Sequence, residues 1–182
     1  MEEKVKFKQT EIGKVPEDLK RSDDFVKALS EFLQKEKFLL AADLNERTKT
    51  HKLAEYLQKY FQDYNVDCEY NRMMEDEGYV TKTLGLKAIP NAPANSLKQI
   101  TVYPDIIIHR RGNDKSNLLV IEVKKKCNNR AKGFDFKKLK AYTSLPLKYE
   151  YGVYIEFDTN GLSDCVSDDN PKFFKDGEEV NE

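Results

Sequence analysis

The chain has 182 residues, of which 39% are hydrophobic and 35% charged, and its net charge is −1. This size and composition predict one globular domain with a highly charged surface and a core that needs no disulfide frame. No apolar run approaches the roughly 18 residues of a membrane-spanning helix, and the first residues lack the apolar stretch of a secretory signal. Three widely spaced cysteines indicate neither a disulfide frame nor a zinc site. We therefore expect a cytoplasmic protein that does not enter a membrane.

The N-terminal region predicts an extension of the core. Residues 1–22 mix charges with glycine and proline and show no periodicity, so they are expected to form an irregular arm. Apolar residues then recur at helical spacing from Asp24 to about Lys35. We expect this arm and helix to pack on the rest of the domain.

A second helix is expected over residues 45–62, where five apolar residues form one stripe: Leu53, Ala54, Leu57, Tyr60 and Phe61. Apolar and polar residues alternate over residues 66–70, which predicts a half-buried strand. Residues 74–101 contain glycines, prolines and only short apolar patches. A connection of this length is either a functional loop or holds structure that the pattern does not reveal.

Two apolar runs flank the polar turn at residues 112–116 and predict a β-hairpin. Folding it between residues 113 and 114 pairs Asp105 with Glu122, and strand alternation places Lys124 on the face of Glu122. Opposed carboxylates repel each other, so this pairing needs a compensating cation. A divalent metal with oxygen ligands is the natural candidate.

The C-terminal part predicts one more helix and one more strand. Asp135 can cap a helix that runs to about Ser144, and residues 151–157 read as a strand that closes the core. From the second helix onward the order is α–β–β–β–α–β, which predicts an α/β fold with a mixed sheet flanked by helices. We divide this single domain into an N-terminal arm and helix, a core and a peripheral acidic tail: residues 1–42, 43–158 and 159–182.

Helix geometry separates two acids on the second helix. At about 100° per residue, Leu53 and Leu57 each lie about 20° from Glu46. Glu55 lies about 180° from Glu46 by the same count. We expect Glu46 to point toward the sheet and Glu55 toward solvent. An acid at a helix start can also belong to a capping box, here with Asp43, so both roles stay open for Glu46.

Charge is unevenly distributed along the chain. Residues 123–140 carry eight Lys or Arg against one acid, and residues 156–182 carry nine acids against two lysines. The basic block follows directly on the suspected site, where a polyanion would have to lie. Such a run can equally be a solvated charged loop.

These residues resemble the PD-(D/E)XK nuclease superfamily, whose restriction-endonuclease-like core has the same element order. The matching residues are Pro104-Asp105, Glu122-Val123-Lys124, and Glu46 in the place of the acid on the first helix. Lys138 and Tyr142 look like the family's Gln-x-x-x-Tyr region, with lysine in place of glutamine. The resemblance covers about residues 43–158 and leaves the arm and the tail outside it.

The resemblance implies a nuclease that uses Mg²⁺ or Mn²⁺ to hydrolyse phosphodiester bonds, in DNA by our expectation. The implied catalytic residues are Asp105, Glu122, Lys124 and Glu46. The implied metal ligands are Asp105, Glu122, Glu46 and the backbone carbonyl of Val123. The residues expected to contact nucleic acid are Lys125, Lys126, Arg130, Lys132 and Lys138, with Tyr142 as an accessory residue.

Two other functions stay open. The fold could serve as a nucleic-acid-binding or assembly module that does not cleave. The chain could also be a regulatory protein whose charged halves pair with a partner, its acidic tail acting as a phosphate mimic. The sequence leaves the oligomeric state open, a homodimer included.

Overall fold

The computed structural model describes residues 5–42, 44–75, 78–81, 83–85, 99–101, 103–112, 116–125, 129–157 and 171–181. The helices in these ranges are α1 (Ser22–Lys35), α2 (Lys37–Ala41), α3 (Glu46–Tyr60) and α4 (Asn129–Thr143). Among the residues described, no helix is both long and apolar enough to cross a membrane.

The central sheet contains β3 (Asn65–Cys68), β8 (Ile106–His109), β9 (Leu119–Lys125), β10 (Tyr151–Phe157), β11 (Lys172–Lys175) and β12 (Glu178–Val180). Their order across the sheet is β12-β11-β10-β9-β8-β3. Strands β9 and β10 run parallel, because α4 makes the crossover between them, whereas β3–β8 and β8–β9 are antiparallel pairs. The protein is therefore of the α/β class, with a mixed sheet.

Shorter strands pair outside this sheet. They are β1 (Phe7–Thr10) with β2 (Gly13–Pro16), β4 (Arg72–Glu75) with β5 (Gly78–Thr81), and β6 (Thr83–Gly85) with β7 (Gln99–Thr101). The strands β4 to β7 fall within the segment 74–101 or at its start. Residues 76–77, 82 and 86–98 of that segment lie outside the described residues, and its role stays open.

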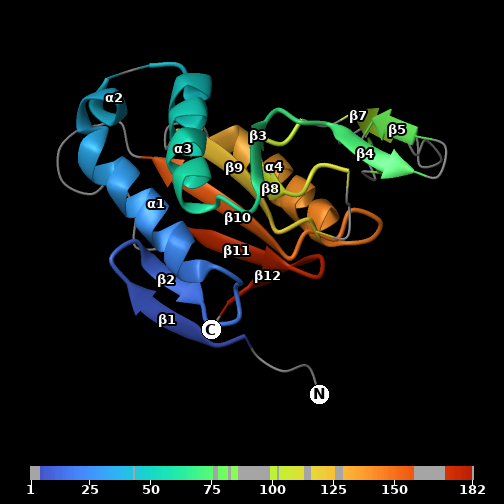
Figure 1. Ribbon diagram of the computed structural model, residues 1–182, viewed down its shortest axis with the longest axis horizontal. Coiled ribbons are helices and arrows are strands. Elements are labelled where there is room, and N and C mark those ends of the chain that lie inside the picture. The colour runs from blue at the N-terminus through green and yellow to red at the C-terminus, as the bar shows by residue number, and fades with distance from the viewer. Residues whose placement is uncertain are drawn as a thin grey trace.

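Helices cover both faces of the central sheet, with α1 and α3 on one side and α4 on the other (Figure 1). Ile121 and Val123 of β9 belong to the core shared with α1 and α3. Val120 packs instead with Leu139 of α4. Because successive strand residues point to opposite faces, Glu122 points with Val120 into the layer covered by α4.

The register predicted for the hairpin is confirmed. Ile106 pairs with Ile121, and Ile108 pairs with Leu119, as a fold between residues 113 and 114 requires. The predicted strand over residues 151–157 coincides with β10, and α1 and α3 begin and end within two residues of their predicted limits. Long apolar periodicity specified these elements.

The N-terminal region differs from the expected irregular arm. Residues 7–16 form the β1–β2 pair, whose turn places Gly13 at a positive φ of 105°. The Thr10 hydroxyl donates to the Gly13 carbonyl at 2.6 Å and so closes this turn. Strands of four residues are too short to show a clear alternation, which explains why the pattern did not reveal them.

The acidic C-terminal segment is not peripheral over its described part, residues 171–181. Strand β11 pairs with β10, and β12 pairs with β11. Phe173 and Phe174 are buried on opposite faces of the sheet, one in each core. In the sequence, two adjacent phenylalanines among charged residues are only a short apolar interruption of a polar tail. In the structure, each ring fills the core on one face of the sheet.

This packing predicts that the C-terminal strands stabilise the whole domain. Phe174→Ala should lower the free energy of unfolding by about 3–5 kcal/mol, because the fully buried ring would leave a cavity beside Phe136 and Leu139. The matched control is Glu178→Ala in β12, whose exposed ion pair with Lys140 should contribute less than about 1 kcal/mol. Urea unfolding measures both. A loss below about 1 kcal/mol for Phe174→Ala would contradict the packing of β11.

Candidate active site

Four elements bring the predicted site residues together. Asp105 immediately precedes β8, Glu122 and Lys124 lie in the second half of β9, and Glu46 is the first residue of α3. The middle of α4 closes the site from the other face of the sheet. Glu46 contacts Lys124, Lys124 and Glu122 reach residues of α4, and Asp105 contacts the backbone of β9.

Asp105 is fixed by the backbone of β9. Its Oδ2 accepts a hydrogen bond from the Val123 N–H at 2.8 Å. Burial raises the pKa of Asp105, although the hydrogen bond from Val123 and the charge of Lys124 partly oppose this. The N–H and C=O of a strand residue point toward the same edge, so the Val123 carbonyl is also directed toward Asp105.

Glu122 is a fully buried carboxylate. Its Oε2 accepts a hydrogen bond from Lys138 Nζ at 2.5 Å, whereas its Oε1 has no hydrogen-bond partner among the residues that the structure describes. Burial, followed by the negative charge of Asp105, raises the pKa of Glu122 to about 8 despite the nearby Lys138 ammonium. Because burial penalises the ionised form, this carboxylate binds a proton more tightly than an exposed glutamate does.

Lys124 joins the first residue of α3 to α4. Its Nζ donates to Glu46 Oε1 at 2.9 Å and lies 3.7 Å from Asp135 Oδ2. Burial opposes its charge, but the hydrogen bond to Glu46 and the charges of Asp135 and Asp105 outweigh burial and raise the pKa of Lys124. The second oxygen of Glu46 accepts from the Lys125 N–H at 3.3 Å. Glu46 thus reaches the site by holding Lys124.

Lys138 and Asp135 are buried partners on α4. Lys138 Nζ lies 3.1 Å from Asp135 Oδ1 in addition to its contact with Glu122. This differs from the prediction that Lys138 contacts nucleic acid, because only 8% of the residue is exposed and its ammonium is engaged inside. Asp135 differs from its predicted role too: α4 begins at Asn129, so Asp135 lies within the helix and does not cap it.

Asp135 is the functional candidate that the sequence pattern missed. The spacing of three residues to Lys138 places both side chains on one helix face, and this face also carries Leu139 and Tyr142. That arrangement, an acid and a base on the apolar stripe of a helix, was the signal available in the sequence. Because Asp135 was interpreted as a helix cap, the helix was expected to begin there. That expectation concealed the pairing of Asp135 with Lys138 inside the helix.

The carboxylates of the site outnumber the ammoniums by four to two. When all are ionised, an excess of two negative charges remains among Glu46, Asp105, Glu122 and Asp135 on one side and Lys124 and Lys138 on the other. A divalent cation would balance this excess. Burial is the main cause of the raised pKa values of Asp105 and Glu122, and for Glu122 the negative charge of Asp105 adds to it.

The possible ligand atoms suit Mg²⁺ better than a metal whose ligands are all protein side chains. Within the described ranges, no three His, Cys, Asp or Glu side chains are gathered so that they could hold a metal ion. Mg²⁺ is usually bound by one or two carboxylates and keeps several waters. Asp105, the partnerless Oε1 of Glu122 and the Val123 carbonyl fit that requirement.

The basic block is only partly available to a ligand. Lys132 pairs with Glu156 Oε2 at 3.1 Å and lies over the Tyr154 ring. Lys125 is half-buried beside Glu46. Lys126 lies outside the described residues, as does the side chain of Arg130 on α4.

Tyr142 is a buried neighbour of Glu122. Its Oη has no hydrogen-bond partner in the ranges that the structure describes, and its ring packs edge-on against Tyr149, with 6.1 Å between the ring centroids. Burial and then the charge of Glu122 raise the pKa of the Tyr142 hydroxyl, which therefore stays protonated. Tyr142 belongs to the core beneath α4 and is not presented to solvent.

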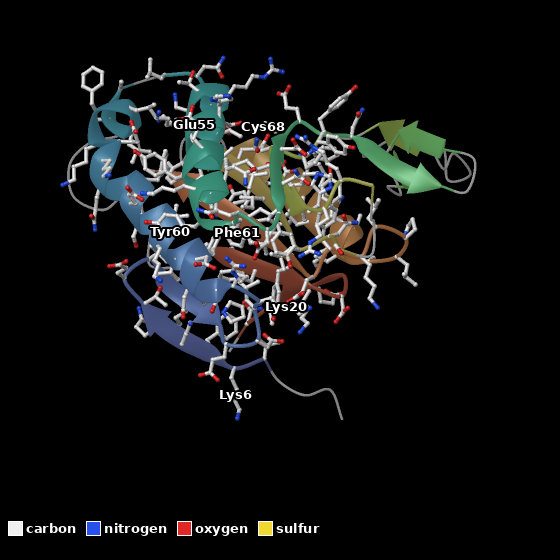
Figure 2. The ribbon with its side chains drawn as sticks, in the orientation of Figure 1. Lys6, Lys20, Glu55, Tyr60, Phe61 and Cys68 are labelled. Carbon is white, nitrogen blue, oxygen red and sulfur yellow. The ribbon has the colours of Figure 1, made fainter. Side chains whose placement is uncertain are left out.

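Glu55 lies outside this site, as the helix geometry predicted. Figure 2 shows Glu55 on α3, beside Cys68 of the edge strand β3. Its half-exposed carboxylate pairs with Lys52 at 2.7 Å, and His51 is largely exposed. Glu55 is therefore a suitable control for changes at Glu46.

The chain matches no family model, no curated protein and no solved structure.

The raised pKa of Glu122 predicts a pH-dependent stability in the presence of a chelator. Between the unfolded value of 4.5 and the folded value of about 8, the folded protein binds the extra proton, so stability falls as pH rises. Glu122→Gln lacks this titration. Its free energy of unfolding relative to wild type should therefore increase with pH by at most about 1.4 kcal/mol per unit.

Urea unfolding at pH 5, 7 and 9 measures this trend. Glu55→Gln is the control: the hydrogen bond from Lys52 lowers the pKa of Glu55, so its contribution is constant across that range. A difference between Glu122→Gln and wild type that does not change with pH would contradict the proposed titration.

Proposed function

We propose that the protein is a metal-dependent nuclease of the PD-(D/E)XK superfamily that hydrolyses phosphodiester bonds, in DNA by expectation. The observation that carries the proposal is the convergence of Asp105, Glu122 and Lys124 in a site where four carboxylates lie among two ammoniums, an excess of two negative charges once all are ionised. A divalent cation would balance those charges, and a bound divalent ion can promote phosphodiester hydrolysis by activating a water molecule and polarising the phosphate.

The order of elements supports the same proposal. The chain passes through α3, β3, β8, β9, α4 and β10 in that order, apart from the short paired strands β4 to β7. The pairs β3–β8 and β8–β9 are antiparallel and β9–β10 is parallel. A restriction-endonuclease-like core has this α–β–β–β–α–β order, with its acidic residues at the hairpin that β8 and β9 form here.

In this proposal Asp105, Glu122 and the Val123 carbonyl would hold Mg²⁺ or Mn²⁺. The bound ion would lower the pKa of a water molecule and neutralise charge that develops on the phosphate. Glu46 would orient Lys124 and would reach the ion through water.

The role proposed for Lys124 is electrostatic. Its raised pKa keeps the ammonium protonated at neutral pH, so it donates hydrogen bonds to a phosphate oxygen and does not act as the base. Glu46 and Asp135 hold it in place from the two faces of the sheet.

A second candidate is a nuclease-like module that binds nucleic acid or assembles with a partner but does not cleave. The observation in its favour is the 2.5 Å contact in which Lys138 occupies one oxygen of Glu122. Metal-dependent cleavage distinguishes the two candidates.

Cleavage should require the site residues. Asp105→Asn keeps an oxygen that can accept from the Val123 N–H but removes the charge, and Lys124→Met removes the ammonium. Each should lower the cleavage rate by about a hundredfold or more. The assay incubates supercoiled plasmid, linear DNA and RNA with the protein and Mg²⁺ or Mn²⁺, with chelator as the negative condition.

The matched pair for this assay is Glu46→Gln against Glu55→Gln, two glutamates on opposite faces of α3. Glu46→Gln should reduce activity because it loosens Lys124, whereas Glu55→Gln should retain it. Near-wild-type cleavage by purified Asp105→Asn would overturn the assignment of the site. Absence of metal-dependent cleavage by the wild type would favour the non-cleaving module.

The basic residues should contribute unequally to nucleic-acid binding. Replacing Lys125, Lys126 and Arg130 by Gln together should flatten the slope of log affinity against log salt by up to roughly three units. Lys132→Gln alone should change it little, because Glu156 already neutralises that ammonium. Affinity for a random-sequence oligonucleotide at several salt concentrations tests this. Equal effects per residue, Lys132 included, would contradict the prediction.

A further inference from the structure

Lys138 holds two carboxylates at once inside the protein. Its Nζ lies 2.5 Å from Glu122 Oε2 and 3.1 Å from Asp135 Oδ1. Glu122 belongs to the strand that carries the proposed metal ligands, whereas Asp135 lies on α4 and is not among them. The ammonium of Lys138 therefore binds the carboxylate of Glu122, for which a metal cation would compete.

The carboxylates of Glu122 and Asp135 can each accept a further interaction. Within the described part of the chain, Glu122 Oε1 and Asp135 Oδ2 are both buried and have no hydrogen-bond partner, although Lys124 Nζ lies 3.7 Å from the latter. A buried ammonium without an anion is strongly unfavourable, so Lys138 can leave Glu122 only if another carboxylate retains it. Asp135 lies three residues away on the same helix face and meets that need.

We propose that Lys138 is an exchangeable counter-ion of Glu122 and that Asp135 is the positioning residue that makes the exchange possible. This inference rests on the proposed function, because it concerns how the same site accepts its divalent cation. In the metal-free protein Lys138 bridges both carboxylates. When a divalent cation binds Glu122, Lys138 stays with Asp135.

The inference differs from a simple effect of charge. If Asp135 acts only through its electrostatic field, its removal weakens cation binding whatever residue occupies position 138. If Asp135 acts through Lys138, its removal matters only while the lysine is present. A double-mutant cycle separates these two cases.

The experiment measures Mn²⁺ binding to the purified, chelator-treated protein by isothermal titration calorimetry. Lys138→Gln removes the competing ammonium and should tighten binding by about tenfold or more. Asp135→Asn leaves Lys138 with Glu122 as its remaining close anion and should weaken binding by about tenfold or more. These changes correspond to about 1.4 kcal/mol each.

The double variant decides between the mechanisms. Asp135→Asn combined with Lys138→Gln should bind Mn²⁺ as tightly as Lys138→Gln alone, within about threefold. The control is Glu156→Gln, which removes an acid that pairs with Lys132 of the same helix and should leave Mn²⁺ affinity unchanged. Thermal unfolding of each metal-free variant establishes that it is folded.

Equal weakening by Asp135→Asn in both backgrounds would overturn the inference and leave the proposed function intact. A Lys138→Gln variant that binds Mn²⁺ no more tightly than wild type would also overturn the inference. This test needs no change at Asp135, so it still applies if Asp135→Asn does not fold. No Mn²⁺ binding by the wild type would overturn the inference together with the metal-dependent function.

Discussion

The buried carboxylate of Glu122 is the constraint around which this protein is organised. An ionised group in a sheet interior is tolerated only if it has a counter-charge or takes up a proton, and Glu122 uses both: Lys138 contacts one oxygen, and its pKa is raised to about 8. A fold stabilised only by its core would have an apolar residue at this position of β9, as at Val120 and Ile121. A buried ionisable side chain at this position costs folding free energy, and such groups are characteristic of functional sites.

The topology explains how charges from distant parts of the chain reach this carboxylate. The parallel pair β9–β10 needs a crossover, and α4 makes it on the face toward which Glu122 points, so that Asp135 and Lys138 lie against β9. The antiparallel neighbour β8 places Asp105 beside the same strand. Helix α3 covers the opposite face, and its first residue, Glu46, reaches Lys124 at the end of β9. Charged side chains from the helix layers on both faces of the sheet therefore converge on β9.

Much of this arrangement could be predicted from the sequence where the apolar pattern was long. The two runs of β8 and β9 specified the register, and the register placed Asp105 against Glu122. The phase of α3 separated Glu46 from Glu55 because a helix of fifteen residues defines a face well. The C-terminal strands could not be predicted in the same way, because segments of three or four residues show little periodicity and their place depends on pairing with β10. Asp135 left a signal in its spacing to Lys138, which its interpretation as a cap concealed.

Three buried polar atoms in the layer between the sheet and α4 lack a hydrogen-bond partner among the described residues: Glu122 Oε1, Asp135 Oδ2 and Tyr142 Oη. Most buried polar atoms in folded proteins are paired, so such a concentration requires an explanation. Packing does not supply one, since the surrounding core of Leu139, Val120 and Phe174 is fully buried. A hydrated divalent cation would satisfy carboxylate oxygens directly and donate hydrogen bonds through its water. The excess negative charge and the unpaired oxygens are thus two consequences of one arrangement, in which the described residues supply more acceptors than their own donors satisfy.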